Sequence, residues 1–201
     1  EGIDSKRAIL LASTYASFVD LAWDEHSKRF RNFMGFDRQW LEREGSQDSF
    51  GRALWAIGRT AELTRNHGLK LWATALADKV IPATGYLTSP RARAFAILGL
   101  AAHLRVYPGL RPARLQLETF AGELLSLLRA ERRSGWTWFE PVLAYDNARL
   151  PEALLLASDV LDDGDMRREA LEALDWLRRL QTASEGHFRP VGTQSFGAEY
   201  Q

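Results

Sequence analysis

Apolar residues recur at helical spacing along most of the chain. Between residues 6 and 22, for example, Ile9, Tyr15, Phe18 and Val19 follow one another at steps that gather them on one side of a helix. No run with the period of a strand has comparable strength. The predicted helices span residues 6–22, 49–65, 69–82, 90–105, 111–131, 148–161 and 165–182. The pattern therefore predicts an all-α protein.

Two connecting segments lack this helical spacing of apolar residues. Residues 24–48 scatter four large aromatic side chains among charges, and we interpret them as a long loop with room for short strands. Residues 134–150 read SGWTWFEPVLAYDNARL, with two tryptophans, two carboxylates and an arginine. Loops usually carry small polar residues, because they have little core to fill. This second connection therefore has the composition of a site lining.

Capping chemistry indicates where three of the helices begin. Ser49, Ser89 and Asn147 each precede a helical run and offer a side-chain oxygen to the free amides of a first turn. Pro90 follows Ser89 at the first helical position, where a missing N–H has little cost. Pro151 lies in a first turn if Asn147 is the cap. We predict these three residues as N-caps.

A weak internal repeat relates the same three helices. Each has a capping residue, then an arginine, then an alanine-rich apolar run: SFGRALWAIG at 49–58, SPRARAFAILG at 89–99 and NARLPEALLLA at 147–157. The helices at 111–131 and 165–182 instead have a charged face and a leucine stripe. Alternating inner and outer helices are typical of an α/α toroid, in which helical hairpins surround an axis. The chain is expected to form an incomplete ring of about seven helices.

In a toroid, the loops that enter the inner helices gather at one end of the axis. Residues 24–48, 84–88 and 134–146 each precede a predicted inner helix, so they are expected to converge on one funnel. The positive ends of the inner helix dipoles would point into that funnel and favour carboxylates or polar ligand oxygens there.

Composition narrows the classes of function. The 201 residues are 46% hydrophobic and 26% charged, as in an ordinary globular domain, so residues 1–201 are treated as one domain. Twenty-six basic residues balance 26 acidic ones, which does not favour nucleic acid as a partner. No apolar run approaches the ~20 residues of a spanning helix, so no membrane insertion is expected. A small or neutral ligand fits this balance better.

Further features bear on location and partners. The chain has no cysteine, which excludes thiolate chemistry and is compatible with the cytoplasm, the location we expect. It begins Glu1-Gly2 without an initiator methionine, which indicates a piece of a longer chain. The missing helices of a ring would leave apolar surface uncovered, so a second copy or the remaining part of the longer chain is an expected partner.

Four stretches carry a resemblance to a known family: SFGRALWAIGR, TSPRARAFAILGL, WTWFEPVLAYDNARLPEALL and LRRLQTASEGHFRPVG. They resemble the helical domain of bacterial group 1 glycosyltransferase proteins, a region separate from the nucleotide-sugar-binding part. That domain is similar to the six-hairpin glycosidase-like toroids. The resemblance covers roughly residues 45–195. It implies a toroid that handles carbohydrate, although the chain has no glycine-rich strand-to-helix turn for a nucleotide sugar.

Glycosidic hydrolysis needs two carboxyl groups beside the bond, one as acid and the other as base or nucleophile. Glu140, Asp146 and Asp48 are the candidates, because all three lie at the predicted funnel. Aromatic faces and hydrogen-bonding groups would hold the sugar. The candidate binding residues are Trp136, Trp138, Tyr145, Asn147, Arg149, Arg52, Trp55, Arg91 and His187.

Each candidate also has a structural interpretation. Trp55 has core spacing, and one of Trp136 and Trp138 is expected to fill the core if the other faces a ligand. Asp146 and Asn147 form an Asx turn and a helix cap in the alternative reading. Buried arginines that bridge loop carbonyls would explain the repeated arginine positions as well as substrate binding does.

No metal or cofactor is expected, since the four histidines include no H-x-x-x-H pair. Two classes of function stay open, and whether the chain is an enzyme is left undecided. The first is a carbohydrate-active domain with glycosidase-like acid and base groups, and the second is a noncatalytic module that binds glycan or organises a larger transferase. A third, a helical scaffold for a protein partner, predicts an exposed apolar groove.

Overall fold

The computed structural model describes residues 5–191 of the chain, and within this range the protein is all-α, as predicted. The helices are α1 (Ser5–Ala22), α2 (Gln47–Leu63), α3 (His67–Val80), α4 (Pro90–Val106), α5 (Arg111–Glu131), α6 (Arg149–Leu161) and α7 (Gly164–Leu180). Each predicted helix is present. Among residues 5–191, no helix combines the length and the apolar content needed to cross a membrane.

The long loop before α2 contains short strands. Strand β1 (Trp23–Asp24) pairs antiparallel with β2 (Arg29–Phe30). The rings of Trp23 and Phe30 lie 5.0 Å apart, and Phe30 in turn meets Phe50 of α2 at 5.4 Å. These edge-on aromatic contacts hold the hairpin against the start of α2. A 3₁₀ helix, η1 (Ile81–Tyr86), joins α3 to the loop before α4.

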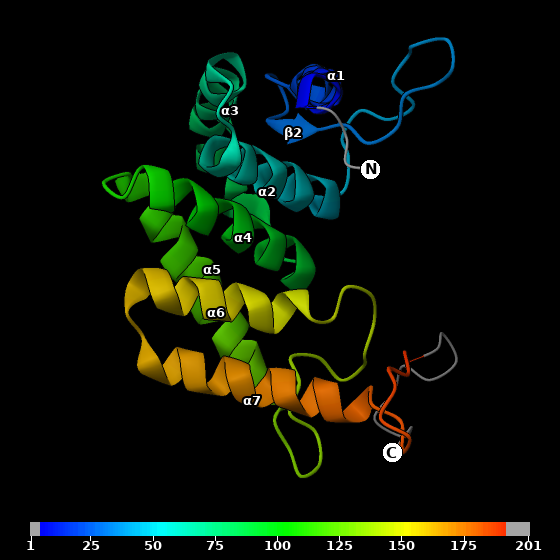
Figure 1. Ribbon diagram of the computed structural model, residues 1–201, viewed down its shortest axis with the longest axis vertical. Coiled ribbons are helices and arrows are strands. Elements are labelled where there is room, and N and C mark those ends of the chain that lie inside the picture. The colour runs from blue at the N-terminus through cyan, green and yellow to red at the C-terminus, as the bar shows by residue number, and fades with distance from the viewer. Residues whose placement is uncertain (1–4, 192–201) are drawn as a thin grey trace.

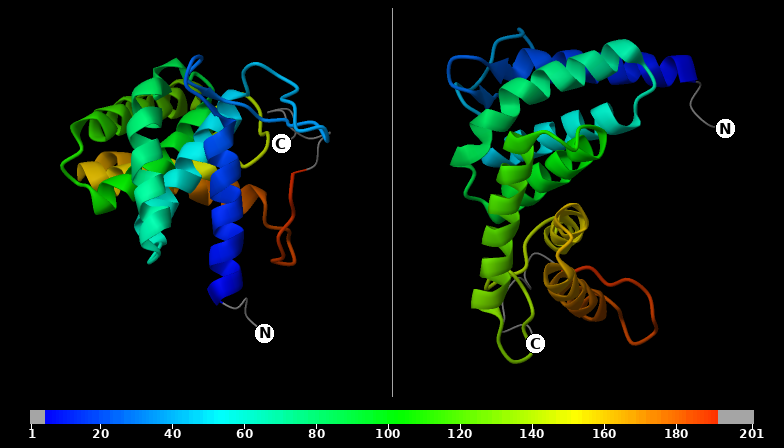
Figure 2. Two further views of the ribbon diagram at one scale, coloured as in Figure 1. Left: turned by 90° about the horizontal axis from the view of Figure 1, so that it is seen from above. Right: turned by 90° about the vertical axis from the view of Figure 1, so that its left-hand side faces the viewer.

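Three helical hairpins make up the body of the molecule, α2–α3, α4–α5 and α6–α7. Helices α2, α4 and α6 lie side by side in a row, with α4 in the middle (Figure 1). Most of α4 is buried, including Phe95, Ile97 and Leu98. Helix α1 lies along one edge of the molecule, beside α3 (Figure 2). The central helix therefore supplies the middle of the hydrophobic core.

Glycines allow α2 and α4 to approach with almost no space between their backbones. A Cβ atom on Gly58 would lie 2.1 Å from the carbonyl oxygen of Gly99, and one on Gly51 would lie 2.5 Å from that of Ala92. Gly51 and Gly58 are seven residues apart, as are Ala92 and Gly99. Gly51 meets Ala92, and seven residues further along both helices Gly58 meets Gly99. Because the contacts advance in the same chain direction on both helices, α2 and α4 run parallel. Their first turns therefore lie at the same end of the molecule.

The predicted N-caps need correction at two of three helices. Helix α2 is capped by Ser46, whose hydroxyl accepts a hydrogen bond from the Ser49 amide. Asn147 is not a cap, because α6 begins one residue later and its N-cap position is Ala148. Ser89 occupies the expected cap position of α4, but its side chain makes no capping bond. Local sequence placed the helices well and their first residues less well. Ser46 caps α2 in place of Ser49, and the Asn147 side chain bonds to Arg91 and Ala144 instead.

A residue that sequence reasoning missed, Gln47, holds the segment that leads into α4. The side-chain carbonyl of Gln47, the first residue of α2, accepts hydrogen bonds from the amides of Thr88 and Ser89 at 2.7 and 2.8 Å. Its amide group also donates to the Thr88 hydroxyl at 3.0 Å. Gln47 therefore fixes the start of α2 against the start of α4.

A buried histidine gives the fold a pH dependence. His103 of α4 is only 1% exposed, and burial lowers its pKa from the ordinary value of 6.5, while the charge of Asp78 acts the other way. The unfolded chain thus binds a proton more readily than the folded one. We expect the free energy of unfolding to decrease as pH falls from 6.5 toward the folded-state pKa.

Urea denaturation across this pH range tests that expectation. His103→Leu should flatten the profile, whereas the same change at the exposed His26 should leave it as in the unmodified chain. A profile with equal slope in the His103→Leu variant would contradict the assignment.

Candidate functional site

Polar side chains from separate parts of the chain meet where α2, α4 and α6 begin, at the right-hand ends of these helices in Figure 1. They come from the first two turns of α2, the first turn of α4 and the segment before α6. We call them the helix-end cluster: Asp48, Arg52, Arg91, Glu140, Tyr145, Asp146 and Asn147. All seven were candidate site residues in the sequence, and the structure brings them together.

Arg91 is the buried centre of the cluster. Its Nη1 donates to both carboxylate oxygens of Glu140, at 2.9 and 2.7 Å, and its Nη2 donates to the Asn147 side-chain oxygen at 3.1 Å. Its Nε donates to the main-chain carbonyl of Tyr145. A buried guanidinium needs this complete set of acceptors. Arg91 therefore joins α4 to the segment that precedes α6.

Arg52 connects the more exposed part of the cluster. Its Nε donates to Asp48 at 2.7 Å, and its Nη2 donates to Asp146. Burial acts to lower the pKa of Arg52, but the bonds to the two carboxylates outweigh it and raise that pKa. One guanidinium thus pairs with two carboxylates that lie far apart in the sequence, and the three groups together keep one negative charge.

Tyr145 and Asn147 complete the arrangement. The Tyr145 hydroxyl donates to the other oxygen of Asp48 at 2.9 Å. Burial, and then the bond to the Asp48 carboxylate, raise the pKa of the Tyr145 phenol. The Asn147 amide accepts from the Ala144 N–H and donates to the Ala144 carbonyl. Asp146 has a φ of 48°, a left-handed conformation that Asp adopts more easily than most residues.

Trp136 and Trp138 point into the core. They are 2% and 0% exposed, and both rings contact Trp176 of α7, at centroid distances of 5.0 and 5.7 Å. The Trp136 indole N–H donates to the main-chain carbonyl of Glu140 at 2.9 Å. The two tryptophans therefore support the segment from beneath, a packing role for both, and present no face to solvent. Sequence reasoning missed Trp176, although its helical spacing was a usable signal.

Trp55 and Arg149 lie in a stack across the helix row. The Arg149 guanidinium lies 4.7 Å from the Trp55 ring centre, and Trp55 lies nearly parallel to Phe95 at 5.9 Å. Arg52 covers the Phe95 ring at 4.1 Å. Cation–π and ring contacts thus join α2, α4 and α6 next to the cluster. Trp55 is half-buried.

The structure does not bring His187 into the cluster. It is exposed in the turn after α7, where its main-chain carbonyl accepts from the Ala183 amide. Among residues 5–191, no group of three potential metal-binding side chains is placed to hold an ion.

The charges of the cluster favour binding over proton transfer. Glu140 is paired with Arg91, while Asp48 and Asp146 are paired with Arg52. A general acid or base needs a carboxylate oxygen that is free to reach the substrate, whereas both oxygens of Glu140 and of Asp48 already accept hydrogen bonds within the cluster. The cluster can offer several acceptors, a phenol and a guanidinium to a polar ligand.

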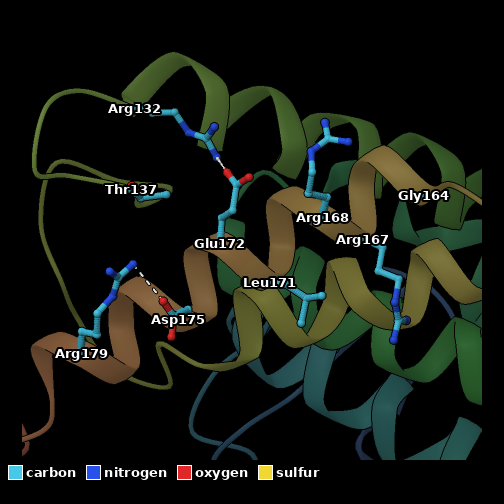
Figure 3. A pocket seen from close by; sticks show the side chains of 9 residues that line it. All are labelled: Arg132, Thr137, Gly164, Arg167, Arg168, Leu171, Glu172, Asp175 and Arg179. Carbon is cyan, nitrogen blue, oxygen red and sulfur yellow. Dashed lines mark hydrogen bonds and ion pairs between the residues drawn. The ribbon is translucent and has the colours of Figure 1, made fainter.

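A separate surface hollow of about 680 Å³ lies against α7 and the end of α5 (Figure 3). Its arginines have acidic neighbours, as in the pairs Arg132–Glu172 and Arg179–Asp175 that the figure marks. Exposed pairs of this kind contribute little to stability or binding. This matches the solvated face that the alternating charges of the last helix predict.

Comparison with protein-family models, with curated proteins and with solved structures finds no match for this chain.

Proposed function

We propose that the chain is a noncatalytic carbohydrate-binding module of a bacterial glycosyltransferase protein, built as an arc of an α/α toroid. The arc proposal is supported by the parallel row of α2, α4 and α6, each followed by the second helix of its hairpin. The stretches that resemble the glycosyltransferase-associated domain cover this row and the segment before α6.

The observation that carries the proposal is the Arg52 part of the helix-end cluster. Asp48, Arg52, Tyr145 and Asp146 form one partly exposed network of charged and hydroxyl groups. Sugar hydroxyls both donate and accept hydrogen bonds, so they are complementary to carboxylates and a guanidinium held at fixed positions. Trp55, a half-buried aromatic residue, lies beside this network in the stack with Phe95, whose ring Arg52 covers.

A glycosidase-like activity is the second candidate. It is favoured by the pairing of Asp48 and Asp146 on either side of one guanidinium, since retaining and inverting glycosidases both place two carboxyl groups close together. The hydrogen bonds of the cluster disfavour it, because Arg52 and Tyr145 already occupy both oxygens of Asp48. Turnover of oligosaccharides by the chain would establish the second candidate over the first.

An oligosaccharide-binding screen tests the proposal, followed by titration with Asp146→Asn. Losing a charged hydrogen-bonding partner costs about 1.5 to 3 kcal/mol, so we expect the dissociation constant to rise about ten- to a hundredfold. The matched control is Asp159→Asn, an exposed carboxylate that also pairs with an arginine, and it should bind as the unmodified chain does. No bound glycan, or equal affinity in both variants, would contradict the proposal.

A further inference from the structure

A hollow of about 460 Å³ lies at the end of α4 opposite to the helix-end cluster, the left-hand end of this helix in Figure 1. It is lined by Thr74 and Asp78 of α3, by His103 and Val106 of α4, and by the turn at residues 107–110. Its volume lies in the range of small-molecule sites, about 300 to 1,000 Å³. We call it the α3–α4 hollow. It shares no residue with the helix-end cluster.

The imidazole of His103 is the buried polar group of the α3–α4 hollow. His103 is 1% exposed, and its Nδ1 has no hydrogen-bond partner among residues 5–191. Buried polar atoms are nearly always paired, so an orphaned imidazole nitrogen in the wall of a hollow points to a group that enters from outside. Burial lowers the pKa of His103, so the ring is mostly neutral near pH 7. A neutral imidazole keeps one ring nitrogen as an acceptor.

The hydroxyl groups of the hollow supply a second acceptor. The Thr74 hydroxyl donates to the main-chain carbonyl of Lys70 at 2.9 Å, which uses its only proton. The Tyr107 hydroxyl lies 3.0 Å from the Thr74 oxygen, so Tyr107 is the donor in this bond. Because the phenol proton is used there, the Tyr107 oxygen is left with lone pairs that can accept from a ligand.

Asp78 places a negative charge at the same hollow. Its side chain is exposed and makes no hydrogen bond or ion pair with any residue of the described range. The charge of Asp78 acts on His103 across the hollow. Val106 and Tyr107 are the last residue and the C-cap of α4, so the negative end of the helix dipole lies here too. The carboxylate and the dipole both favour a cation.

The hollow is therefore complementary to a positively charged hydrogen-bond donor. A primary ammonium group has three protons to donate and no lone pair, which matches three acceptors. Val106, Pro108 and Leu110 add an apolar wall for a short hydrocarbon chain. An anion would meet the charge of Asp78. A metal ion is disfavoured as well, since residues 5–191 include no group of three metal-binding side chains.

We propose that the α3–α4 hollow binds a small primary amine in its protonated form. The ammonium group lies among Asp78, His103 and Tyr107, and the hydrocarbon part lies against Pro108 and Leu110. The proposed carbohydrate site is at the other end of α4 and uses other residues, so neither proposal depends on the other.

Titration with n-butylammonium, followed by proton NMR, tests the site. The chain has four histidines, and His103→Leu identifies which Cε1–H signal belongs to His103. We expect that signal to shift to saturation with a dissociation constant of about 1 mM or tighter. The neutral n-butanol has the same number of heavy atoms and should bind at least about tenfold more weakly. A His103 signal that stays in place, or that responds equally to n-butanol, would overturn the proposal.

Asp78→Asn should raise the dissociation constant of n-butylammonium at least about tenfold, because a charged hydrogen-bonding partner is lost. The matched control is Asp175→Asn on α7, an exposed carboxylate outside the hollow whose loss changes the net charge equally. Circular dichroism should show the same fold in both variants. Equal weakening by both changes would mean that only the net charge matters, and the proposed site would be refuted.

A blocked lysine, Nα-acetyl-lysine methylamide, distinguishes a free amine from a lysine side chain of a protein. Both carry the same ammonium group on a four-carbon chain. We expect the blocked lysine to bind no more tightly than n-butylammonium, since its peptide groups have no assigned partner in the hollow. Tighter binding of the blocked lysine would identify a protein as the source of the ammonium group and overturn the small-molecule proposal.

Discussion

Gly58→Ala is expected to destabilise the protein by about 2 to 3 kcal/mol, because the added methyl group would overlap the backbone of α4. Its Cβ would lie 2.1 Å from the Gly99 carbonyl oxygen and 2.9 Å from the Gly99 Cα. Backbone atoms in the middle of a buried helix cannot move as the end of a flexible side chain can, so the two central helices must separate. Urea denaturation should show a lower midpoint with an unchanged slope.

Gly122→Ala provides the control. Gly122 lies within α5, and a Cβ there would have no neighbour within 4 Å. Alanine has the higher helix propensity by up to about 1 kcal/mol, so this variant should be as stable as the unmodified chain or more so. Equal destabilisation by both changes would show that glycine matters for helix formation and not for the contact between α2 and α4.

Arg91→Met is expected to cost about 3 kcal/mol or more, because it leaves Glu140 without its partner. The change also removes the donors to the Tyr145 carbonyl and to the Asn147 side chain. The expected loss of stability lies near the lower end of the usual range for a broken buried ion pair, since the Glu140 side chain is 21% exposed and water can solvate it in part. Thermal and urea unfolding would measure the loss.

A double-mutant cycle separates the ion pair from simple packing. Arg91→Met combined with Glu140→Gln should recover part of the lost stability, because no unpaired charge remains. Arg168→Met breaks an exposed pair with Asp165 and should cause no measurable change. If the double variant is no more stable than Arg91→Met, the energy lies in the other bonds of Arg91.

The segment before α6, residues 134–148, is rich in aromatic and charged residues, and it shows what the sequence could and could not predict. Its unusual chemistry correctly indicated a place where separate parts of the chain meet. The sequence could not show which way each side chain points, because residues 134–148 lack a regular period. Trp136 and Trp138 both pack on Trp176, which lies 38 residues after Trp138 in the chain. Glu140 likewise finds its partner, Arg91, on another helix.

The glycines give a second example. The alanine-rich runs predicted α2, α4 and α6 as the inner helices of a toroid. That Gly58 faces Gly99 depends on the relative rotation of two helices, which local propensity does not determine. The exposure of large apolar residues on α1, such as Leu10 and Tyr15, was also hidden, because apolar spacing shows that a helix has an apolar side but not which neighbour covers it.

The sequence by itself determined the all-α class, the seven helical segments and the residues that gather at the helix starts. These follow from local chemistry, since helical periodicity, proline and glycine act over a few neighbouring residues. The tertiary structure alone decided which charges pair, which aromatic rings are buried and which large apolar residues of α1 stay exposed. Those properties arise from contacts between residues far apart in the chain, where packing and desolvation outweigh local preference.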